Sequence, residues 1–405
     1  MVSETNASGW LTAKRLRAHG TILALCFWSI YIWNLATPGL RDRNGNLKGT
    51  DFLHFYILGS LAVEHRGADL YDMSVQARLA AQRVPDAAGI RYLPLYPPQV
   101  SLIFAPLAHL SYGWALIWWW GCSIAVYSAC FFSMWRACPN LRDYGGTVVA
   151  LAAGFPAFFH LIAWGQTSAL ALGCFTLAFF LMRARHDFLS GLALGCLIFK
   201  PQLGLAAAVV LLATGAWKIV AGGVLSALAQ LFVGVFYYGW EPLQRWVSTL
   251  LHARSIMPLL EPRLYQTHSL RTFWTLLLPW PNVAFALYVA TAVAVLILTT
   301  ACWKRSSALE LRFPMLLLAT VLVAPHLTVY DLLILAPAFL LLADWLVAQP
   351  PSLSIRNLGT FLYLVYILPL PGPFTRRTHV QLSVIAMAAS LYAIWRLVKT
   401  SRTET

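Results

Sequence analysis

The sequence predicts an all-α polytopic membrane protein that forms one domain over residues 1–405. Two observations carry this prediction. Of the 405 residues, 59% are hydrophobic and only 11% are charged, whereas a soluble domain carries about 25% charged residues. Apolar runs of helical length also recur along the chain, separated by short loops. A water-soluble enzyme, a disordered chain and a disulfide-stapled secreted module are therefore excluded.

The apolar runs predict about twelve transmembrane helices, because a crossing needs about 20 apolar residues. The first run, about 21–36, follows Lys14, Arg15 and Arg17 and is read as an uncleaved helix with its N-terminus in the cytoplasm. In this threading every short inner loop carries Lys or Arg, which also puts the C-terminus inside. The later runs are 97–135, 145–163, 166–182, 188–199, 202–216, 219–239, 276–302, 311–324, 332–347, 357–370 and 379–395. Whether 97–135 is one crossing or a re-entrant half plus a crossing stays open.

The net charge of +14 is explained by membrane topology and anionic lipid headgroups, so we expect no nucleic-acid partner. The seven cysteines are odd in number and form no C-x-x-C motif, so they are read as buried hydrophobic residues. The chain contains no nucleotide-binding motif and no zinc-protease motif. The first outer loop also lacks an Asp-x-Asp pair. We therefore expect no metal and no cofactor.

Two outer segments, 38–96 and 240–275, are too long to be simple connections, and functional residues concentrate on such loops. Within the first, residues 51–66 and 69–83 show helical spacing of apolar residues and suit amphipathic helices in the headgroup plane. The Tyr96-Pro97-Pro98 sequence then blocks helix continuation and predicts a rigid turn into the membrane.

Polar residues interrupt the apolar runs at positions that the threading places on the same outer face. Such residues are costly at membrane depth and are functional candidates by default. The interruptions are Gly165-Gln166-Thr167-Ser168, Lys200-Pro201-Gln202, Pro325-His326 and Tyr330-Asp331.

Asp51, near the membrane plane, could accept a proton from a hydroxyl. Lys200, Arg271 and His326 suit a phosphate. This combination fits group transfer from a lipid-linked phosphate, and it also fits a transporter of an anionic substrate.

Each candidate also has a purely structural interpretation. Asp51 could be a helix N-cap, Lys200 could extend its ammonium from a helix end to the interface, and His326 could be a core histidine. The remaining candidates could serve as helix-start hydrogen bonders or as interfacial aromatic residues, namely Gln166, Asp331, Tyr96 and Tyr330.

The order of these motifs resembles glycosyltransferase family 87. This family comprises bacterial multi-pass enzymes of the membrane-embedded glycosyltransferase C-type fold that use polyprenyl-phosphate sugars. Its best-known members are α-mannosyltransferases that act on phosphatidylinositol mannosides and related glycolipids. The resemblance covers roughly residues 15–345. The motifs that carry it are Asp51-Phe52 with Tyr56, Leu70-Tyr71, Tyr96-Pro97-Pro98, Gly165-Gln166, Lys200-Pro201, His268-Ser269-Leu270, and Pro325-His326 with Tyr330-Asp331.

The resemblance implies inverting transfer of a hexose, with mannose as the default, from a polyprenyl-phosphate sugar to a glycolipid or glycan acceptor. Asp51 would be the general base, and His326 would lie near the donor phosphate. The residues expected to bind substrate are Tyr96, Gln166, Lys200, Gln202, His268, Arg271, Tyr330 and Asp331, of which Lys200 and Arg271 are proposed on electrostatic grounds.

The resemblance also implies a bacterial inner-membrane protein with its active site on the periplasmic face. Residues 266–270, Gln-Thr-His-Ser-Leu, depart from the Asn-Gln expected before Ser-Leu, which makes the acceptor the least transferable inference. The alternative function is a transporter or flippase of a lipid-linked or anionic substrate, although a transporter usually contains an internal repeat and none is evident here.

Overall fold

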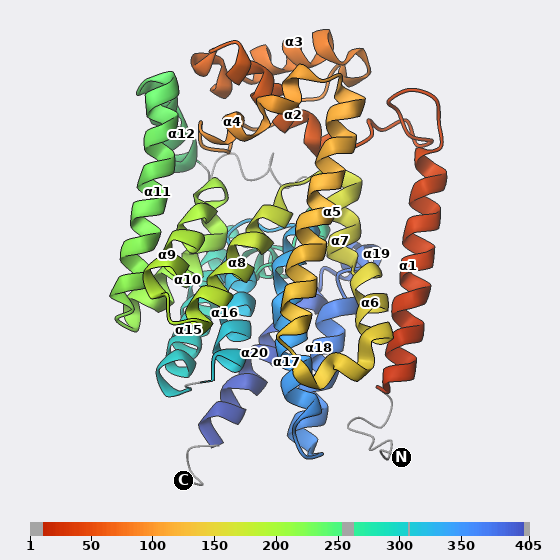
Figure 1. Cartoon of the computed structure of the whole chain (residues 1–405), viewed down its shortest axis with the longest axis vertical. Helices are drawn as coiled ribbons and strands as arrows, with labels where there is room; N and C mark the ends of the chain where they lie inside the picture. The colour runs from red at the N-terminus through yellow and green to blue at the C-terminus, as the bar shows by residue number, and fades with distance from the viewer. Residues whose placement is uncertain (1–10, 253–262, 307, 401–405) are drawn as a thin grey trace.

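The structure is a computed structural model and describes residues 11–252, 263–306 and 308–400 (Figure 1). The described part consists of helices joined by loops and contains no β-strand. Its only extended pairings are two isolated bridges, Arg41 with Leu47 and Thr267 with Thr328. The prediction of an all-α fold is therefore confirmed for these residues.

Six helices in the described residues are long and apolar enough to cross a membrane, so the chain is a membrane protein. They are α1 (Ala13–Leu35), α5 (Tyr112–Arg136), α11 (Trp217–Tyr238), α15 (Pro281–Arg305), η7 with α17 (Val329–Leu335 and Ala336–Val347), and α20 (Leu382–Thr400). Two bent pairs raise the number to eight if each counts as one span. These are η4 and α6 with α7 (Pro139–Tyr144, Gly145–Ala153 and Pro156–Trp164), bent by 42°, and α18 with α19 (Leu353–Ile367 and Gly372–Thr378), bent by 94°.

The expected twelve crossings are not confirmed, because several of the expected segments form short helices. At 1.5 Å per residue, the 16 residues of α8 reach about 24 Å, less than the roughly 30 Å hydrocarbon core. The short helices are α8 (Ser168–Arg183), α9 with η5 (Asp187–Gly195 and Cys196–Phe199), α10 (Pro201–Ala213) and α16 (Leu309–Val323). Polar breaks at 165–168, at Lys200 and at 324–328 adjoin these helices, which shortens the apolar runs.

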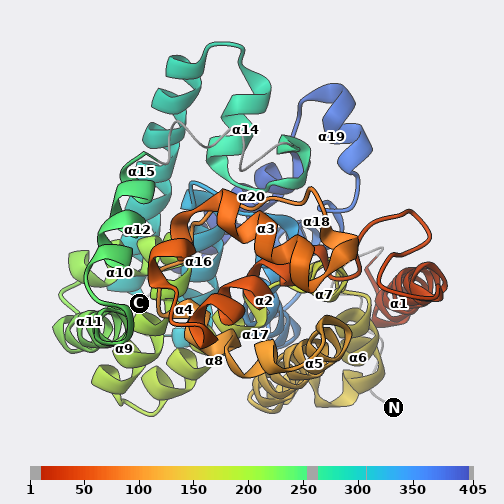
Figure 2. The ribbon, with the colours of Figure 1, turned by 90° about the horizontal axis from the view of Figure 1, so that it is seen from above.

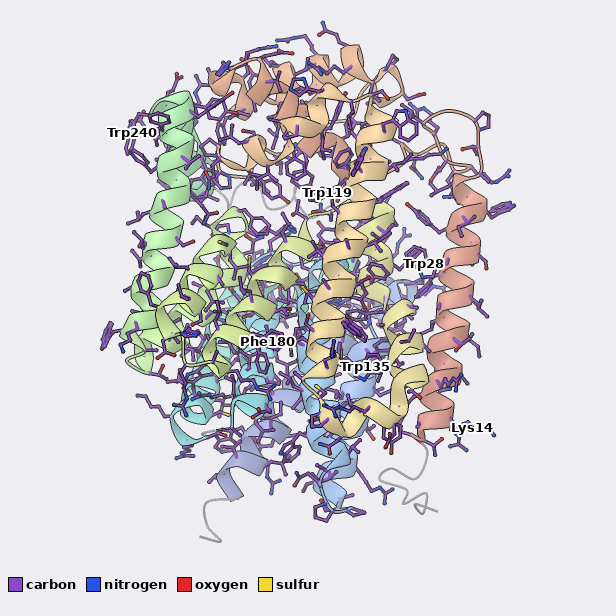
Figure 3. The ribbon with its side chains drawn as sticks, in the orientation of Figure 1. Lys14, Trp28, Trp119, Trp135, Phe180 and Trp240 are labelled. Carbon is purple, nitrogen blue, oxygen red and sulfur yellow. The ribbon has the colours of Figure 1, made fainter. Side chains whose placement is uncertain are left out.

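The bundle has two chemically different ends. In Figure 1, α1 begins and α20 ends at the bottom, whereas α2, α3 and α4 lie across the top. Figure 3 shows Lys14 at the lower end of α1 and Trp240, 60% exposed, at the upper end beside α11. Aromatic residues with a polar atom favour the membrane–water interface, and Trp240 has the exposure that such a position requires.

A helical cap built from the first loop covers the upper end. It consists of α2 (Thr50–Val63), η1 (Gly67–Tyr71), α3 (Met73–Arg83), η2 (Pro85–Ala87), α4 (Val100–Phe104) and η3 (Pro106–His109). Seen from above in Figure 2, α2 and α3 lie over the middle of the bundle. The expected run 97–135 therefore contains two short helices of the cap and then the single long helix α5.

The amphipathic helix expected over 51–66 is not confirmed. Every residue from Phe52 to Ala62 is buried, so α2 has no solvated polar face. The reason is that other cap elements cover it, because α4, η3, α3 and η1 all pack against α2. Apolar spacing along 51–66 could not reveal this second layer.

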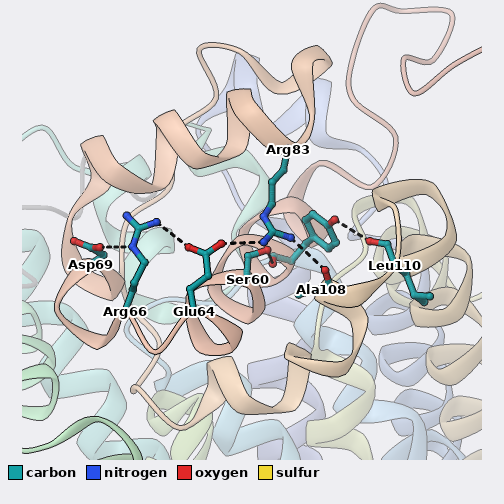
Figure 4. Close-up of polar contacts among 8 residues, drawn as sticks. Ser60, Glu64, Arg66, Asp69, Arg83, Ala108 and Leu110 are labelled. Carbon is teal, nitrogen blue, oxygen red and sulfur yellow. Dashed lines mark hydrogen bonds and ion pairs between the residues drawn. The ribbon is translucent and has the colours of Figure 1, made fainter.

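Ion pairs join the end of α2 to the rest of the cap (Figure 4). The Arg66 guanidinium lies 2.7 Å from Asp69 and 2.9 Å from Glu64, and Glu64 lies 2.9 Å from Arg83. Arg83 also donates to the carbonyl of Ala108, at 3.2 Å. Single exposed pairs contribute at most about 1 kcal/mol, so the chief effect of this network is to fix the orientation of α2 relative to α3 and η3.

The second long outer segment, expected over 240–275, also contains helices. They are α12 (Glu241–Leu251), η6 (Leu264–Gln266) and the start of α14 (Leu270–Leu277), while residues 253–262 lie outside the described part. Helix α12 packs on the cap, because Arg245 donates to the Ala68 carbonyl at 3.2 Å and Trp246 to the Leu95 carbonyl at 3.0 Å.

Candidate active site

The centre of the candidate site is a hydrogen bond between the first loop and the membrane bundle. Gln166 Nε2 donates to Asp51 Oδ2 at 2.6 Å. Asp51 is the second residue of α2, whose N-cap is Gly49 without a side-chain cap bond. The N-cap interpretation of Asp51 is therefore wrong. Its carboxylate instead contacts Gln166, at the break between α7 and α8.

The backbone before Asp51 is held by two tyrosines. Tyr112 donates its hydroxyl to the carbonyls of Lys48 and Gly49, at 2.8 and 2.9 Å. Tyr92 donates to the Thr50 carbonyl. These bonds satisfy carbonyls at the point where the chain turns into α2, and so fix the position from which Asp51 projects.

Gln166 is positioned by the end of α7. Gly165 closes this helix with φ of +72°, a conformation that glycine adopts without steric cost. A Cβ at this position would lie 2.6 Å from Phe52 Cβ, so the missing side chain lets α2 approach the break. Trp119 donates to the Gly165 carbonyl at 3.0 Å and Trp120 to the Ile162 carbonyl at 2.7 Å, which ties α5 to the same turn.

A buried ion pair lies next to this centre. Lys200 Nζ is 2.7 Å from Asp331 Oδ1, and the two side chains are 4% and 2% exposed. Ser168 donates to the same carboxylate oxygen at 2.5 Å, and Lys200 donates to Ser168 Oγ at 3.1 Å. Asp331 Oδ2 forms a capping box with Thr328. The Lys200 charge is thus neutralised inside the protein rather than extended to the membrane interface.

The two tyrosine candidates differ in burial and in their neighbours. Tyr330 is 7% exposed; its ring centroid is 5.1 Å from Lys200 Nζ and 5.8 Å from the Trp164 ring. Its burial argues against an interfacial role. Tyr96 is half-buried in the loop before α4, and its ring lies 5.8 Å from that of His54.

Arg271 and His326 are brought together by the pairing of two loops. Thr267 and Thr328 form an antiparallel bridge, and His268 donates its N–H to the Leu327 carbonyl at 3.0 Å. Arg271 Nε donates to the carbonyl of Pro325, the neighbour of His326. Both Arg271 and His326 are half-buried.

Two of the residues predicted to bind substrate, His268 and Gln202, lie away from the Asp51–Gln166 contact. His268 is 2% exposed, and its Nδ1 lies 2.8 Å from Ser383 Oγ and 3.2 Å from Gln381 Nε2. It therefore faces the start of α20. Gln202 is half-buried in the first turn of α10, beyond the Lys200 ion pair, and makes no side-chain hydrogen bond to another described residue.

Burial sets the protonation of these groups. It raises the pKa of Asp51 to about 6, while the Gln166 hydrogen bond and the Lys200 charge oppose the rise and the Asp331 charge adds to it. Burial lowers the pKa of His326 to about 4, against the favourable charge of Asp331, so its imidazole is neutral at pH 7. The pKa of Arg271 falls to about 10, which leaves it charged. The site thus combines a carboxylate that can take a proton with a neutral donor and a cation.

The sequence reasoning missed several residues of this arrangement. Tyr92 and Tyr112 lay in the loop and at the start of a long helix, with no motif to mark them. Ser168 was visible as part of the 165–168 break, but its bond to Asp331 joins residues far apart in the chain. His54 could have been noticed as a polar residue inside an otherwise apolar stretch.

Comparison with known proteins shows the family to which the chain belongs. A family model described as glycosyltransferase family 87 matches residues 95–329, which is more than half of the chain. No curated protein and no solved structure matches the chain. The matched range includes Gln166, Lys200, Arg271 and His326, whereas Asp51 lies before it and joins the site only through the folded structure.

Proposed function

Because the chain belongs to glycosyltransferase family 87, and is therefore a glycosyltransferase, we propose that it transfers a hexose from a polyprenyl-phosphate sugar to a glycolipid or glycan acceptor. Mannose is the default sugar. Family membership favours transfer over the alternative of a transporter or flippase.

The contact between Asp51 and Gln166 carries the proposal. It is supported by a half-buried carboxylate, held at 2.6 Å by an amide, whose pKa of about 6 is close to the value at which a base is efficient at neutral pH. Asp51 accepts the proton of the acceptor hydroxyl while that oxygen attacks the anomeric carbon. The bond from this carbon to the phosphate oxygen breaks on the opposite side, and polyprenyl phosphate leaves with the electron pair.

The leaving phosphate needs positive charge or donors fixed where negative charge develops. Arg271 and His326, half-buried and adjacent through Pro325, are the residues we assign to it. Tyr96 and Gln202, also half-buried, are candidates for direct contact with sugar or lipid.

The fully buried candidates are assigned a positioning role. Lys200 and Asp331 form an ion pair with Ser168, and Tyr330 packs on Lys200. His268 supports the loop that carries Arg271. These residues act on substrate through Gln166, Arg271 and His326.

The orientation we propose puts the cap and the active site on the periplasmic face of a bacterial inner membrane, with both termini in the cytoplasm and up to twelve crossings. The distribution of cations supports it. Helix ends at the face opposite the cap carry Lys14, Arg15, Arg17, Arg136, Arg183, Lys304, Arg305 and Lys399. Lys and Arg at the ends of short inner loops are typical of the cytoplasmic face.

The test uses the purified full chain in nanodiscs with polyprenyl-phosphate mannose and octyl α-mannoside. Loss of a general base costs about 10²- to 10⁴-fold in rate, so we expect Asp51→Asn to reduce transfer by at least about 100-fold. Asp86→Asn is the matched control, because Asp86 lies in the same loop and pairs with Arg41 at the surface. Equal transfer by wild type and Asp51→Asn would remove the base assignment.

A further inference from the structure

A cluster of cations lies at the end of the bundle opposite the cap (Figure 1). This cation cluster occupies the α8–α9 and α15–α16 loops with the adjoining helix ends, and it consists of Arg183, Arg185, Lys304, Arg305 and Arg312. The two loops lie together because α8 packs on α16, where the rings of Phe179 and Phe313 are 5.2 Å apart. Helix α8 has 16 residues and therefore separates the cation cluster from Ser168, in the candidate active site, by about 24 Å.

No member of the cation cluster forms an ion pair with another described residue. The ion pairs of the described residues lie in the first loop and in α12, apart from the buried Lys200–Asp331 pair. Asp187 and Glu310 are near enough for their charges to act on Arg312, but neither is paired with it. The cation cluster thus keeps an excess of positive charge, which attracts an external anion.

Arg312 presents a donor group that is held in place but not satisfied. Its guanidinium carbon lies 5.0 Å from the centre of the Trp303 ring, and a cation–π contact of this kind orients the planar group. The side chain is half-buried, and its Nε is buried without a hydrogen-bond partner among the described residues. Buried nitrogen donors are nearly always paired. The guanidinium of Arg312 is therefore fixed in position and still lacks an acceptor.

Arg185 brings a second guanidinium to the same place. Its side chain is exposed in the α8–α9 loop, and its positive charge acts on Arg312. Two like charges repel each other, and an anion bound between them replaces this repulsion by attraction to both. Guanidinium groups bind phosphate strongly, often through two parallel N–H···O bonds. The two arginines therefore suit the phosphate group of a ligand.

Exposed apolar residues next to Arg185 indicate that this phosphate belongs to a lipid. Phe188 and Leu189, in the first turn of α9, are 41% and 45% exposed. On α15, Ile297 is 62% exposed and lies about two turns from Trp303, toward the middle of the helix. A phospholipid covers this apolar surface with its acyl chains while its phosphate reaches the guanidinium groups. Free phosphate contacts the cations alone.

We infer that Arg185 and Arg312 bind the phosphate of an anionic phospholipid, whose acyl chains lie against α9. An anionic lipid is favoured over a zwitterionic one, because the amine of a zwitterionic headgroup would meet the other cations of the cluster, Arg183, Lys304 and Arg305. The inference does not depend on the proposed transfer reaction, since the cation cluster and the candidate active site lie at opposite ends of α8.

Photolabelling tests the inference. The full chain is reconstituted in phosphatidylcholine nanodiscs that contain a trace of phosphatidylglycerol with a diazirine on its acyl chain, close to the glycerol. A phosphatidylcholine probe with the same diazirine is the comparison, and mass spectrometry locates the label. A hydrogen bond to a charged group strengthens binding by about ten-fold or more. We therefore expect the phosphatidylglycerol probe to label α9 at least about ten-fold more than the phosphatidylcholine probe.

Competition distinguishes a lipid from a free phosphate. Unlabelled phosphatidylglycerol should displace the phosphatidylglycerol probe from α9, whereas soluble glycerol 1-phosphate should leave the labelling unchanged. Equal displacement by the two competitors would overturn the lipid assignment, because the acyl chains would then contribute nothing to binding.

The variants Arg185→Gln and Arg312→Gln should each reduce the labelling preference to less than about two-fold, because each removes charge-assisted bonds to the phosphate. Arg185 is exposed, so its variant keeps the test open if Arg312→Gln does not fold. Lys14→Gln is the matched control, since Lys14 is an exposed cation at the same end of the bundle, on the side away from α9 (Figures 1 and 3). It should retain the preference. Equal labelling by the two probes, an unchanged preference in Arg185→Gln, or an equal loss in Lys14→Gln overturns the inference.

Discussion

Gly165→Ala is the perturbation whose effect can be worked out most directly from the structure. Gly165 has φ of +72° and a Cβ there would lie 2.6 Å from Phe52 Cβ. An L-residue in this backbone region costs about 1–2 kcal/mol, and overpacking of a tight contact costs about 1–3 kcal/mol more. We therefore expect a loss of about 2–5 kcal/mol in the free energy of unfolding.

The same substitution should also affect catalysis, because the added methyl group pushes α2 away from the helix break. The clash would involve position 165 and Phe52, which directly adjoin Gln166 and Asp51 in the chain. A misplacement of catalytic groups by about 1 Å can cost about 100-fold in rate. The assays are thermal unfolding in nanodiscs and transfer from polyprenyl-phosphate mannose to octyl α-mannoside, measured on the same preparation.

Gly215→Ala separates the two effects. Gly215 has nearly the same φ, +71°, but a Cβ there would meet only Trp217 Nε1 at 3.7 Å, an ordinary contact. The Gly215→Ala variant should lose only about 1–2 kcal/mol of unfolding free energy, from the backbone conformation, and should retain the wild-type transfer rate. If the two variants lost equal stability and activity, the close approach of α2 to the break would not control the geometry of the site.

Further predictions concern the titration of the base and the buried ion pair. Because Asp51 has a pKa of about 6 and acts in its ionised form, kcat/KM should fall as the pH is lowered through 6 and level off above it; a profile flat down to pH 4.5 would contradict this. Lys200→Met leaves Asp331 as an unpaired buried charge and should cost about 3–5 kcal/mol of unfolding free energy. The double variant Lys200→Met/Asp331→Asn should recover much of that loss, and a double variant no more stable than the single would show that the pair is not coupled.

The membrane character and the elements of the bundle could be predicted from the sequence because apolar composition and helix-breaking residues are local signals. The break at 165–168 separates α7 from α8, and the prolines at 97–98 lie just before the start of α4. The predicted turn at 97–98 leads into a cap helix, however, and not directly into a membrane span. The number of membrane crossings could not be predicted as well from the sequence. Hydropathy reports that a segment is apolar, but it does not distinguish a full span from a short helix such as α8 that packs within the protein.

For the site, the sequence likewise predicted which residues are candidates but not which of them contact one another. Asp51, Gln166 and Asp331 could be selected because a polar residue beside an apolar run is costly and therefore needs a reason. Their partners could not be assigned, because the Lys200–Asp331 and Asp51–Gln166 contacts depend on helix packing between distant segments. Thus Lys200, expected as a free phosphate-binding cation, is paired inside the protein. The burial of residues 52–62 of α2 could not be predicted for a similar reason, since the elements that cover them include α4 and η3.

The most direct measurement is the position of a polyprenyl phosphate, or a non-transferable analogue, in an experimental structure of the complex. The account predicts that the phosphate contacts Arg271 and His326, with the anomeric carbon of a bound sugar facing Asp51 beneath the cap. A phosphate bound at the opposite end of the bundle, near the start of α1 and away from Gln166, would contradict it.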